Sequence, residues 1–184
     1  MVPTSIQYSN VCTGCPAISE SFGYNPDGTV ASTTNRNGVT TAYTYTTDGR
    51  KLVASTTQAA GTSVMRTVST TWHATLAKPL QVIEPTRTTS YTYDGAGRTL
   101  TTSVAVTGET TRTTTYTYTP EGWLATAKGP RTDVNETTTY TYYANGNVQT
   151  VTNPKGQVTT YKQRGQVFHY HIRHARLLKS WPAP

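Results

Sequence analysis

A short aromatic pattern returns along most of this 184-residue chain and limits its fold more than any other feature. Each copy has an aromatic residue, any residue, a second aromatic, three further residues and then Gly. A period of roughly 19–27 residues is typical of stacked repeat proteins, whose units are too small to bury a core alone. The five clear copies are Phe22/Tyr24/Gly28, Tyr43/Tyr45/Gly49, Tyr91/Tyr93/Gly97, Tyr116/Tyr118/Gly122 and Tyr140/Tyr142/Gly146.

Two degenerate copies complete the series. One is Thr70-x-Trp72, which lies in the long gap between the second and third clear copies. The other is Thr159-x-Tyr161, which keeps the three-residue gap to Gly165. We therefore expect about seven units in an array over residues 21–167, with a lead-in at 1–20 and a divergent basic tail at 168–184.

Each unit has the pattern of a β-hairpin. In residues 89–93, Thr and Tyr alternate, which puts Tyr91 and Tyr93 on one face of a strand and the threonines on the other. A tight turn follows at Asp94–Gly97, where Gly accepts positive φ most easily. An aliphatic residue two or three positions past the Gly is expected to return to the tyrosine face, as at Val30, Leu52, Leu100, Leu124, Val148 and Val167.

The sequence therefore predicts an all-β protein of tandem hairpins that form one continuous twisted or spiralling sheet. Threonine and tyrosine are both strand-forming residues, and we expect almost no helix. Residues 168–184 lose the threonines and the turn signals, so they are expected to be an irregular tail. A distinct functional tail and a boundary that cuts across a longer repeat region both explain this change, and its abruptness favours the second.

Charge argues against a nucleic-acid partner. Five of the seven net positive charges lie in residues 162–184, so the repeats are close to neutral and carry no basic stripe. No apolar stretch is long enough to span a bilayer, so no membrane span is expected. No signal peptide is visible at the N-terminus, which indicates either export by a route without one or an internal piece of a longer protein.

The sequence offers few candidates for catalysis or metal binding. Cys12 and Cys15 form a single CxxC, for which a local disulfide or two idle thiols is favoured over half of a zinc site. His73, beside Trp72, is more easily explained as a packed ring than as a base. Three carboxylates precede turn glycines and are explained by turn chemistry: Asp27, Asp48 and Glu121.

Two further patterns are weak. His169, His171 and His174 cannot all project from one face of a regular element, and no carboxylate follows to orient them. Asn135-Glu136-Thr137 fits an N-glycosylation sequon, which chance alone explains among so many threonines. We expect no enzyme, no cofactor and no metal site.

The tyrosine face has two explanations. Exposed aromatic rings can stack on sugars, which would make the face a glycan platform. In a chain with only 34% hydrophobic residues, however, tyrosine must supply buried area, and we favour a core role.

At Tyr91-Thr92-Tyr93-Asp94-Gly95-Ala96-Gly97-Arg98-Thr99-Leu100 the chain resembles the YD repeat of the RHS family. The family pattern is aromatic-x-Tyr-Asp-x-x-Gly-Arg-Leu, and this copy has one inserted residue before the Leu. The other copies keep the frame but replace the Asp, by Thr46, Thr119 and Tyr143. The resemblance covers residues from about Phe22 to Val167.

The resemblance implies a role. RHS repeats form hairpins wound into a spiral sheet, which in complete proteins becomes a shell around a C-terminal toxin domain. It therefore implies a secreted or surface-displayed, non-enzymatic wall segment whose partners are further YD repeats and a toxin or effector domain absent from this chain. The alternative is a carbohydrate-binding adhesion module that recognises cell-surface glycans.

Overall fold

The computed structural model describes residues 5–8, 18–164 and 167–173. These residues form fifteen strands and no helix. No segment of the described chain is therefore a helix that could cross a membrane. The all-β prediction is confirmed.

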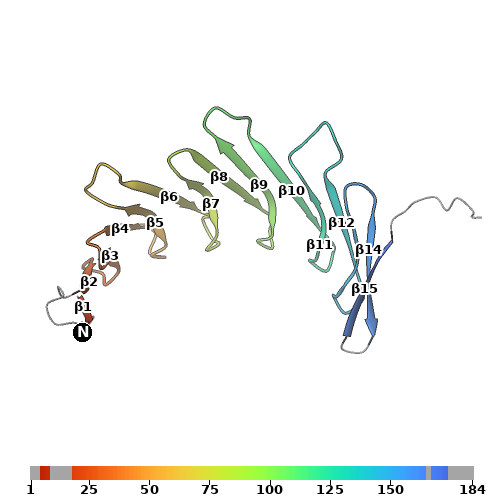
Figure 1. Cartoon of the computed structure of the whole chain (residues 1–184), viewed down its shortest axis with the longest axis horizontal. Helices are drawn as coiled ribbons and strands as arrows, with labels where there is room; N and C mark the ends of the chain where they lie inside the picture. The colour runs from red at the N-terminus through yellow and green to blue at the C-terminus, as the bar shows by residue number, and fades with distance from the viewer. Residues whose placement is uncertain (1–4, 9–17, 165–166, 174–184) are drawn as a thin grey trace, which may run out of the picture. The chain divides into compact units, whose positions relative to one another are not determined.

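The strands follow one another across an antiparallel sheet in chain order (Figure 1). They are β1 (Ser5–Tyr8), β2 (Ile18–Tyr24), β3 (Val30–Thr34), β4 (Thr40–Tyr45), β5 (Val53–Gln58), β6 (Arg66–Trp72), β7 (Pro79–Ile83), β8 (Arg87–Tyr93), β9 (Thr99–Val106), β10 (Arg112–Tyr118), β11 (Leu124–Lys128), β12 (Thr137–Tyr142), β13 (Val148–Thr152), β14 (Val158–Arg164) and β15 (Val167–Arg173).

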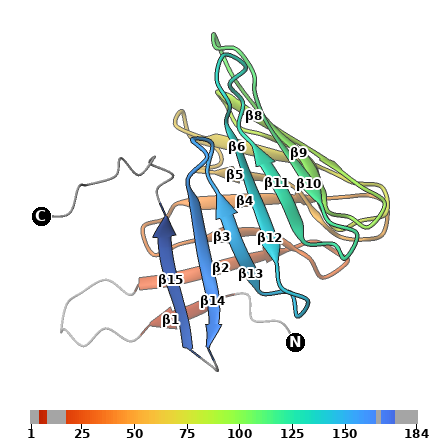
Figure 2. The same ribbon diagram turned by 90° about the vertical axis from the view of Figure 1, so that its right-hand side faces the viewer.

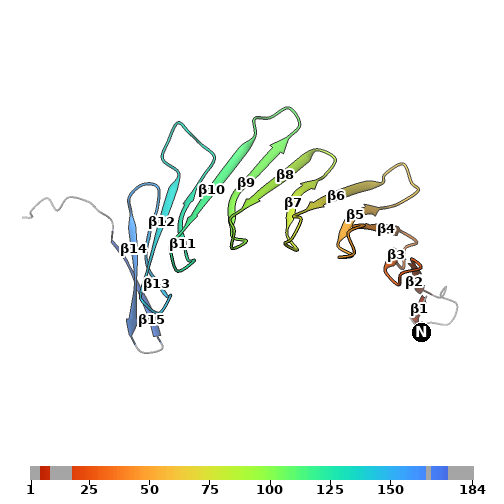
Figure 3. The ribbon, with the colours of Figure 1, turned by 180° about the vertical axis from the view of Figure 1, so that it is seen from behind.

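The chain divides into two compact units. One contains residues 1–91 and 104–110, and the other contains residues 92–103 and 111–184. Within the second unit, β10 to β15 lie side by side, each paired with the next strand in sequence (Figure 2). Within the first, β1 to β8 pair in the same sequential way (Figure 3). The predicted tandem hairpins are therefore present in both units.

Strands extend past both expected ends of the array. Strand β1 pairs with β2, so the sheet includes part of the lead-in. Strand β15 pairs with β14 over seven residue pairs, from Arg164↔Val167 to Val158↔Arg173. Residues 168–173, expected to be irregular, are thus regular strand, because their alternating residues can extend the ladder that β14 leaves open.

The glycine turns share one backbone geometry. In the turn 94–98, the N–H of Gly97 donates to the carbonyl of Asp94 at 2.9 Å, and the N–H of Asp94 donates to the carbonyl of Arg98 at 2.9 Å. The same pair of bonds closes the turns at residues 25–29, 119–123 and 143–147. Gly97 has φ 78°, a left-handed conformation that costs an L-residue energy.

A one-residue register shift follows these turns. Thr117 pairs with Thr126, but Tyr118 pairs with Leu124, so β11 carries one extra residue. The shift returns the aliphatic residue to the tyrosine face, as predicted for Val30, Leu124 and Val148. The prediction for Leu52 is wrong: Tyr45 pairs with Val53, because the longer turn there takes Leu52 into its closing backbone bond.

The two faces of the sheet differ as expected. The tyrosines are half-buried, whereas the threonines between them, such as Thr117 and Thr141, are exposed. Threonine and serine hydroxyls pair across strands on that second face, for example Thr117 with Thr126 at 2.7 Å and Thr141 with Thr150 at 2.6 Å. These cross-strand pairs explain the abundance of threonine.

The favoured role of tyrosine as a buried core is wrong in one respect. No hydrophobic side chain is buried among those that the structure describes. The tyrosine rings are therefore half-buried and not enclosed. Tyrosine tolerates this position because its ring can pack while its hydroxyl finds a partner.

A candidate assembly site at the seams between hairpins

The second aromatic of a repeat bridges its hairpin to the preceding one. The hydroxyl of Tyr118 donates to the carbonyl of Thr99 at 2.7 Å, and the hydroxyl of Tyr142 donates to the carbonyl of Leu124 at 2.8 Å. Tyr45 bonds the carbonyl of Val30 in the same way at 2.8 Å. In each case the acceptor is the first residue of the strand that follows the turn of the preceding hairpin. The same bond therefore recurs at three seams, the boundaries between one hairpin and the next.

The register explains why these carbonyls need a partner. Between β11 and β12, the paired residues run only from Lys128↔Thr137 to Thr126↔Thr139. The carbonyl of Leu124 lies past the end of this ladder, where the hairpins separate towards their turns. A backbone carbonyl without a partner is costly unless water reaches it, and the Tyr142 hydroxyl supplies the bond.

Burial affects the tyrosines that make these bonds. Desolvation raises the pKa of Tyr118, and the carboxylate of Asp94 raises it further. Desolvation likewise raises the pKa of Tyr142. Both hydroxyls therefore remain protonated donors well above neutral pH.

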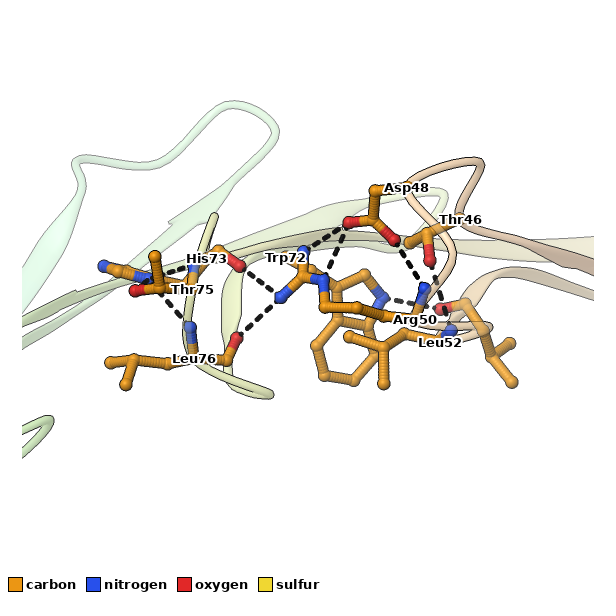
Figure 4. A network of polar contacts seen from close by, with 9 residues as sticks. Thr46, Asp48, Arg50, Leu52, Trp72, His73, Thr75 and Leu76 are labelled. Carbon is orange, nitrogen blue, oxygen red and sulfur yellow. Dashed lines mark hydrogen bonds and ion pairs between the residues drawn. The ribbon is translucent and has the colours of Figure 1, made fainter.

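Trp72 performs the same role in the degenerate copy. Its indole Nε1–H donates to the carbonyl of Val53, the first residue of β5, at 2.8 Å (Figure 4). Indole nitrogen is a donor only, and a donor is what this carbonyl requires. The copy has lost the tyrosine but kept the bond.

Asp94 organises the turn of the copy closest to the YD pattern. Its Oδ1 accepts the backbone N–H groups of Ala96 at 3.0 Å and Arg98 at 2.8 Å, and its Oδ2 accepts Nε of Arg98 at 2.7 Å. The backbone bond from Arg98 is the main reason that the pKa of Asp94 lies below its ordinary value. The carboxylate is therefore ionised throughout the neutral range.

In two repeats of the second unit, the residue after the turn glycine reaches the next hairpin. The guanidinium of Arg98 lies 4.8 Å from the ring centre of Tyr118, a cation–π contact. Trp123, at the equivalent position one repeat later, lies with its ring centre 5.2 Å from that of Tyr142. Arg98 also borders Gly122, and Trp123 borders Gly146, close enough that a Cβ at either glycine would crowd them.

Arg50 makes the corresponding forward contact in the first unit. Its Nη1 donates to the carbonyls of His73 at 2.7 Å and Leu76 at 3.1 Å, in the connection after Trp72 (Figure 4). Asp48 holds the same guanidinium through an ion pair of 2.6 Å. Hydrogen bonds from the Arg50 side chain are the main cause that lowers the pKa of Asp48 to about 2.

The remaining predicted motif residues occupy less specific positions. The first aromatics of the copies, such as Tyr116 and Tyr140, are half-buried on the same face as the second. Tyr43 contacts the hydroxyl of Thr33 at 3.5 Å. Phe22 and Tyr24 are half-buried on β2, and Tyr91 and Tyr93 are half-buried on β8. The turn glycines Gly28, Gly49, Gly122 and Gly146 all have positive φ.

Sequence analysis missed three contributors to the seams: Arg50, Trp72 as a donor, and Trp123. Of these, only Arg50 could have been identified from the sequence, because Arg follows the turn glycine at both 50 and 98. The other two contacts depend on which neighbouring hairpin each side chain meets, and a single copy of the pattern does not reveal that.

The candidates for other chemistry are placed as follows. His73 uses Nδ1 to accept backbone N–H groups within its own connection. Among the described residues, no three His, Cys, Asp or Glu side chains gather as a metal site would require. Cys12, Cys15 and His174 lie outside the described residues, and the side chains of His169 and His171 are outside them as well.

The fold is similar to parts of solved Tc toxin structures. The chain aligns with a complex of TcdB2, TccC3 and Cdc42 at a TM-score of 0.69, with 13% identity over 85% of this chain and 9% of that one. It aligns with the Photorhabdus luminescens Tc holotoxin pore at 0.70, with 15% identity over 85% and 9%. A third match, to TcdB2–TccC3, has a TM-score of 0.53 at 14% identity over 86% and 11%.

The chain thus spans about a tenth of the length of the chains that it matches. No family model matches it. No curated protein matches it either. The fold that the resemblance to RHS/YD repeats implies is therefore confirmed.

Proposed function

We propose that this chain is a non-enzymatic wall segment of an RHS/YD-repeat shell that encloses or displays a toxin or effector domain absent from the chain. Its partners in that role are further YD repeats and the enclosed domain of a longer parent protein. Secretion or surface display follows from the same role.

The seam contacts are the observation that carries this proposal. Several hairpins give their second aromatic to the hairpin before them, and three give their post-glycine residue to the hairpin after them. Tyr118 and Trp123 illustrate both directions within one hairpin. Contacts that link each unit only to its neighbours suit a wall that grows by adding repeats.

The test uses the parent protein, identified from the coding sequence on either side. We expect further YD repeats upstream and a variable domain downstream. Limited proteolysis of that protein should leave the downstream domain intact while the repeats are folded, and should degrade it once they are unfolded. A parent without a downstream domain, or one whose downstream domain is cut freely in the native state, would contradict the proposal.

Glycan binding is a second candidate, favoured by one feature of the second unit. An open hollow of about 550 Å³ lies beside the turn 119–123, and aromatic rings form much of its lining. Rings beside a carboxylate could stack on a sugar and bond its hydroxyls. The hollow is lined by Thr119, Glu121, Trp123, Tyr140, Thr141, Tyr142, Tyr143 and Ala144.

A glycan array followed by titration calorimetry would separate the two candidates. A platform predicts specific binding that Tyr140→Ala abolishes and Tyr116→Ala leaves unchanged, since Tyr116 has the same place in the preceding hairpin but does not line the hollow. The wall proposal predicts no specific sugar. Binding that survives Tyr140→Ala would contradict the platform at this hollow.

A further inference from the structure

His73 occupies the place that an aspartate or asparagine holds in other turns. It follows Trp72, as Asp94 follows Tyr93. Where Asp94 accepts two backbone N–H groups through Oδ1, His73 accepts two through Nδ1, from Thr75 and Leu76, each at 3.2 Å. The imidazole therefore caps this connection in place of an oxygen.

The cap requires one protonation state. Nδ1 can accept these bonds only in the neutral ring, with the proton on Nε2. A protonated Nδ1 can no longer accept the two backbone N–H groups; it can only donate, and the Thr75 hydroxyl lies 3.4 Å away. Histidine is the side chain whose charge ordinarily changes between pH 5 and 8, whereas aspartate changes at a far lower pH.

Two elements supply the charged residues that contact the backbone of the connection or each other. The preceding turn supplies Arg50, whose Nη1 is bonded to the carbonyl of His73 itself, and Asp48, which is engaged by Arg50. Within the connection the charged residue is Lys78, whose backbone carbonyl accepts the backbone N–H of His73 at 2.9 Å. Figure 4 shows Arg50 donating to the same short segment that the imidazole caps.

We propose that His73 is an acid-sensitive cap: protonation at Nδ1 opens the connection 73–78 and loosens its contact with Arg50. The seam between the β4–β5 and β6–β7 hairpins then weakens at a pH at which aspartate-capped turns stay closed. This device is independent of what the wall encloses, and it would make one hairpin of the array the first to yield on mild acidification.

Amide hydrogen exchange of the whole chain at pH 7.5 and pH 5.0, corrected for intrinsic rates, tests the proposal. We expect the protection of the Thr75 and Leu76 amides to fall by about tenfold at pH 5.0, the effect of losing one hydrogen bond. The Ala96 and Arg98 amides, which bond the Asp94 carboxylate, serve as an internal control and should keep their protection.

Two substitutions separate the cap from its surroundings. His73→Asp supplies a carboxylate acceptor that does not titrate in this range, so protection should be high at both pH values. His73→Ala removes the acceptor, so protection should be low at both. If His73→Asp does not fold, as shown by circular dichroism and loss of Ala96 protection, His73→Asn provides the same non-titrating acceptor.

Two outcomes would overturn the proposal. One is wild-type protection of Thr75 and Leu76 that is equal at the two pH values. The other is a pH-dependent loss that persists in His73→Asp or His73→Asn, because the titrating group would then lie elsewhere.

Discussion

In the turn 94–98, Asp94 and Gly97 close the chain within five residues, whereas the connection 73–78 contains no glycine and is contacted by Arg50 of the preceding hairpin. Both lie after a second aromatic and both join the two strands of a hairpin. The turn 94–98 is closed by its own residues, whereas the connection 73–78 depends partly on Arg50 of the preceding hairpin. Repeats of this kind therefore preserve a set of contacts, and the residues that make each contact can change.

The difference has a consequence for stability. A turn with Asp and Gly fixes its conformation locally, so a change there affects mainly its own hairpin. A connection held by a neighbour transmits any loss across the seam. We expect the loss of a side chain that makes a contact across the seam beside 73–78 to have the larger effect.

Trp72→Ala should have the largest effect of all. It removes a half-buried ring and the bond to the carbonyl of Val53, and we expect a loss of roughly 2–4 kcal/mol in the free energy of unfolding. Urea denaturation followed by circular dichroism measures it. Trp72→Tyr, which restores the donor of the clear copies, should recover most of the loss. Equal losses for the two variants would show that the bond across the seam is unimportant.

Gly97→Ala should lower the free energy of unfolding by less than Trp72→Ala does. It should show that the turn 94–98 depends on its backbone conformation. Alanine at φ 78° is strained by about 1–2 kcal/mol, which urea denaturation would detect. The matched change in the other connection, Ala77→Gly, should lower stability by no more than about 0.5–1 kcal/mol, because only chain entropy is affected. If Ala77→Gly proved the more harmful, the contrast between the two turns would be lost.

Much of this architecture follows from the sequence, for identifiable reasons. Alternation at Tyr91 and Tyr93 gave the strand and its faces, and Gly97 and Gly122 marked the turns. The bond from Trp72 could not be predicted, because the sequence shows neither how far the ladder between β5 and β6 extends nor which carbonyl it leaves open. Leu52 was misplaced for a related reason: a turn lengthened by two residues changes which residue meets Tyr45.

Tyr118→Phe tests the seam bond alone. The ring and its packing remain, while the bond to the carbonyl of Thr99 is lost, and we expect the free energy of unfolding to fall by about 1 kcal/mol. Tyr116→Phe removes a hydroxyl from the same face of the same strand and should change stability by less than about 0.5 kcal/mol. An equal loss in Tyr116→Phe would show that the effect comes from hydroxyl solvation on that face and not from the bond across the seam.

Asp48→Asn should have the smallest effect and should appear only in acid. The pKa of Asp48 is about 2 in the folded chain and ordinarily 3.8, so its ionised form favours folding. That contribution is complete above the ordinary pKa and is lost as the pH falls through 4 towards 2. Because the carboxylate is solvent-exposed, the effect at neutral pH is weakened by screening.

Thermal unfolding from pH 5 to pH 2 should therefore show a shallower decline of the melting temperature in Asp48→Asn than in the wild type, with the two curves converging at the acid end. A decline of equal steepness in both proteins would mean that the Asp48–Arg50 pair is no stronger in the folded chain than in the unfolded one, and that Arg50 contacts the next hairpin without help from Asp48.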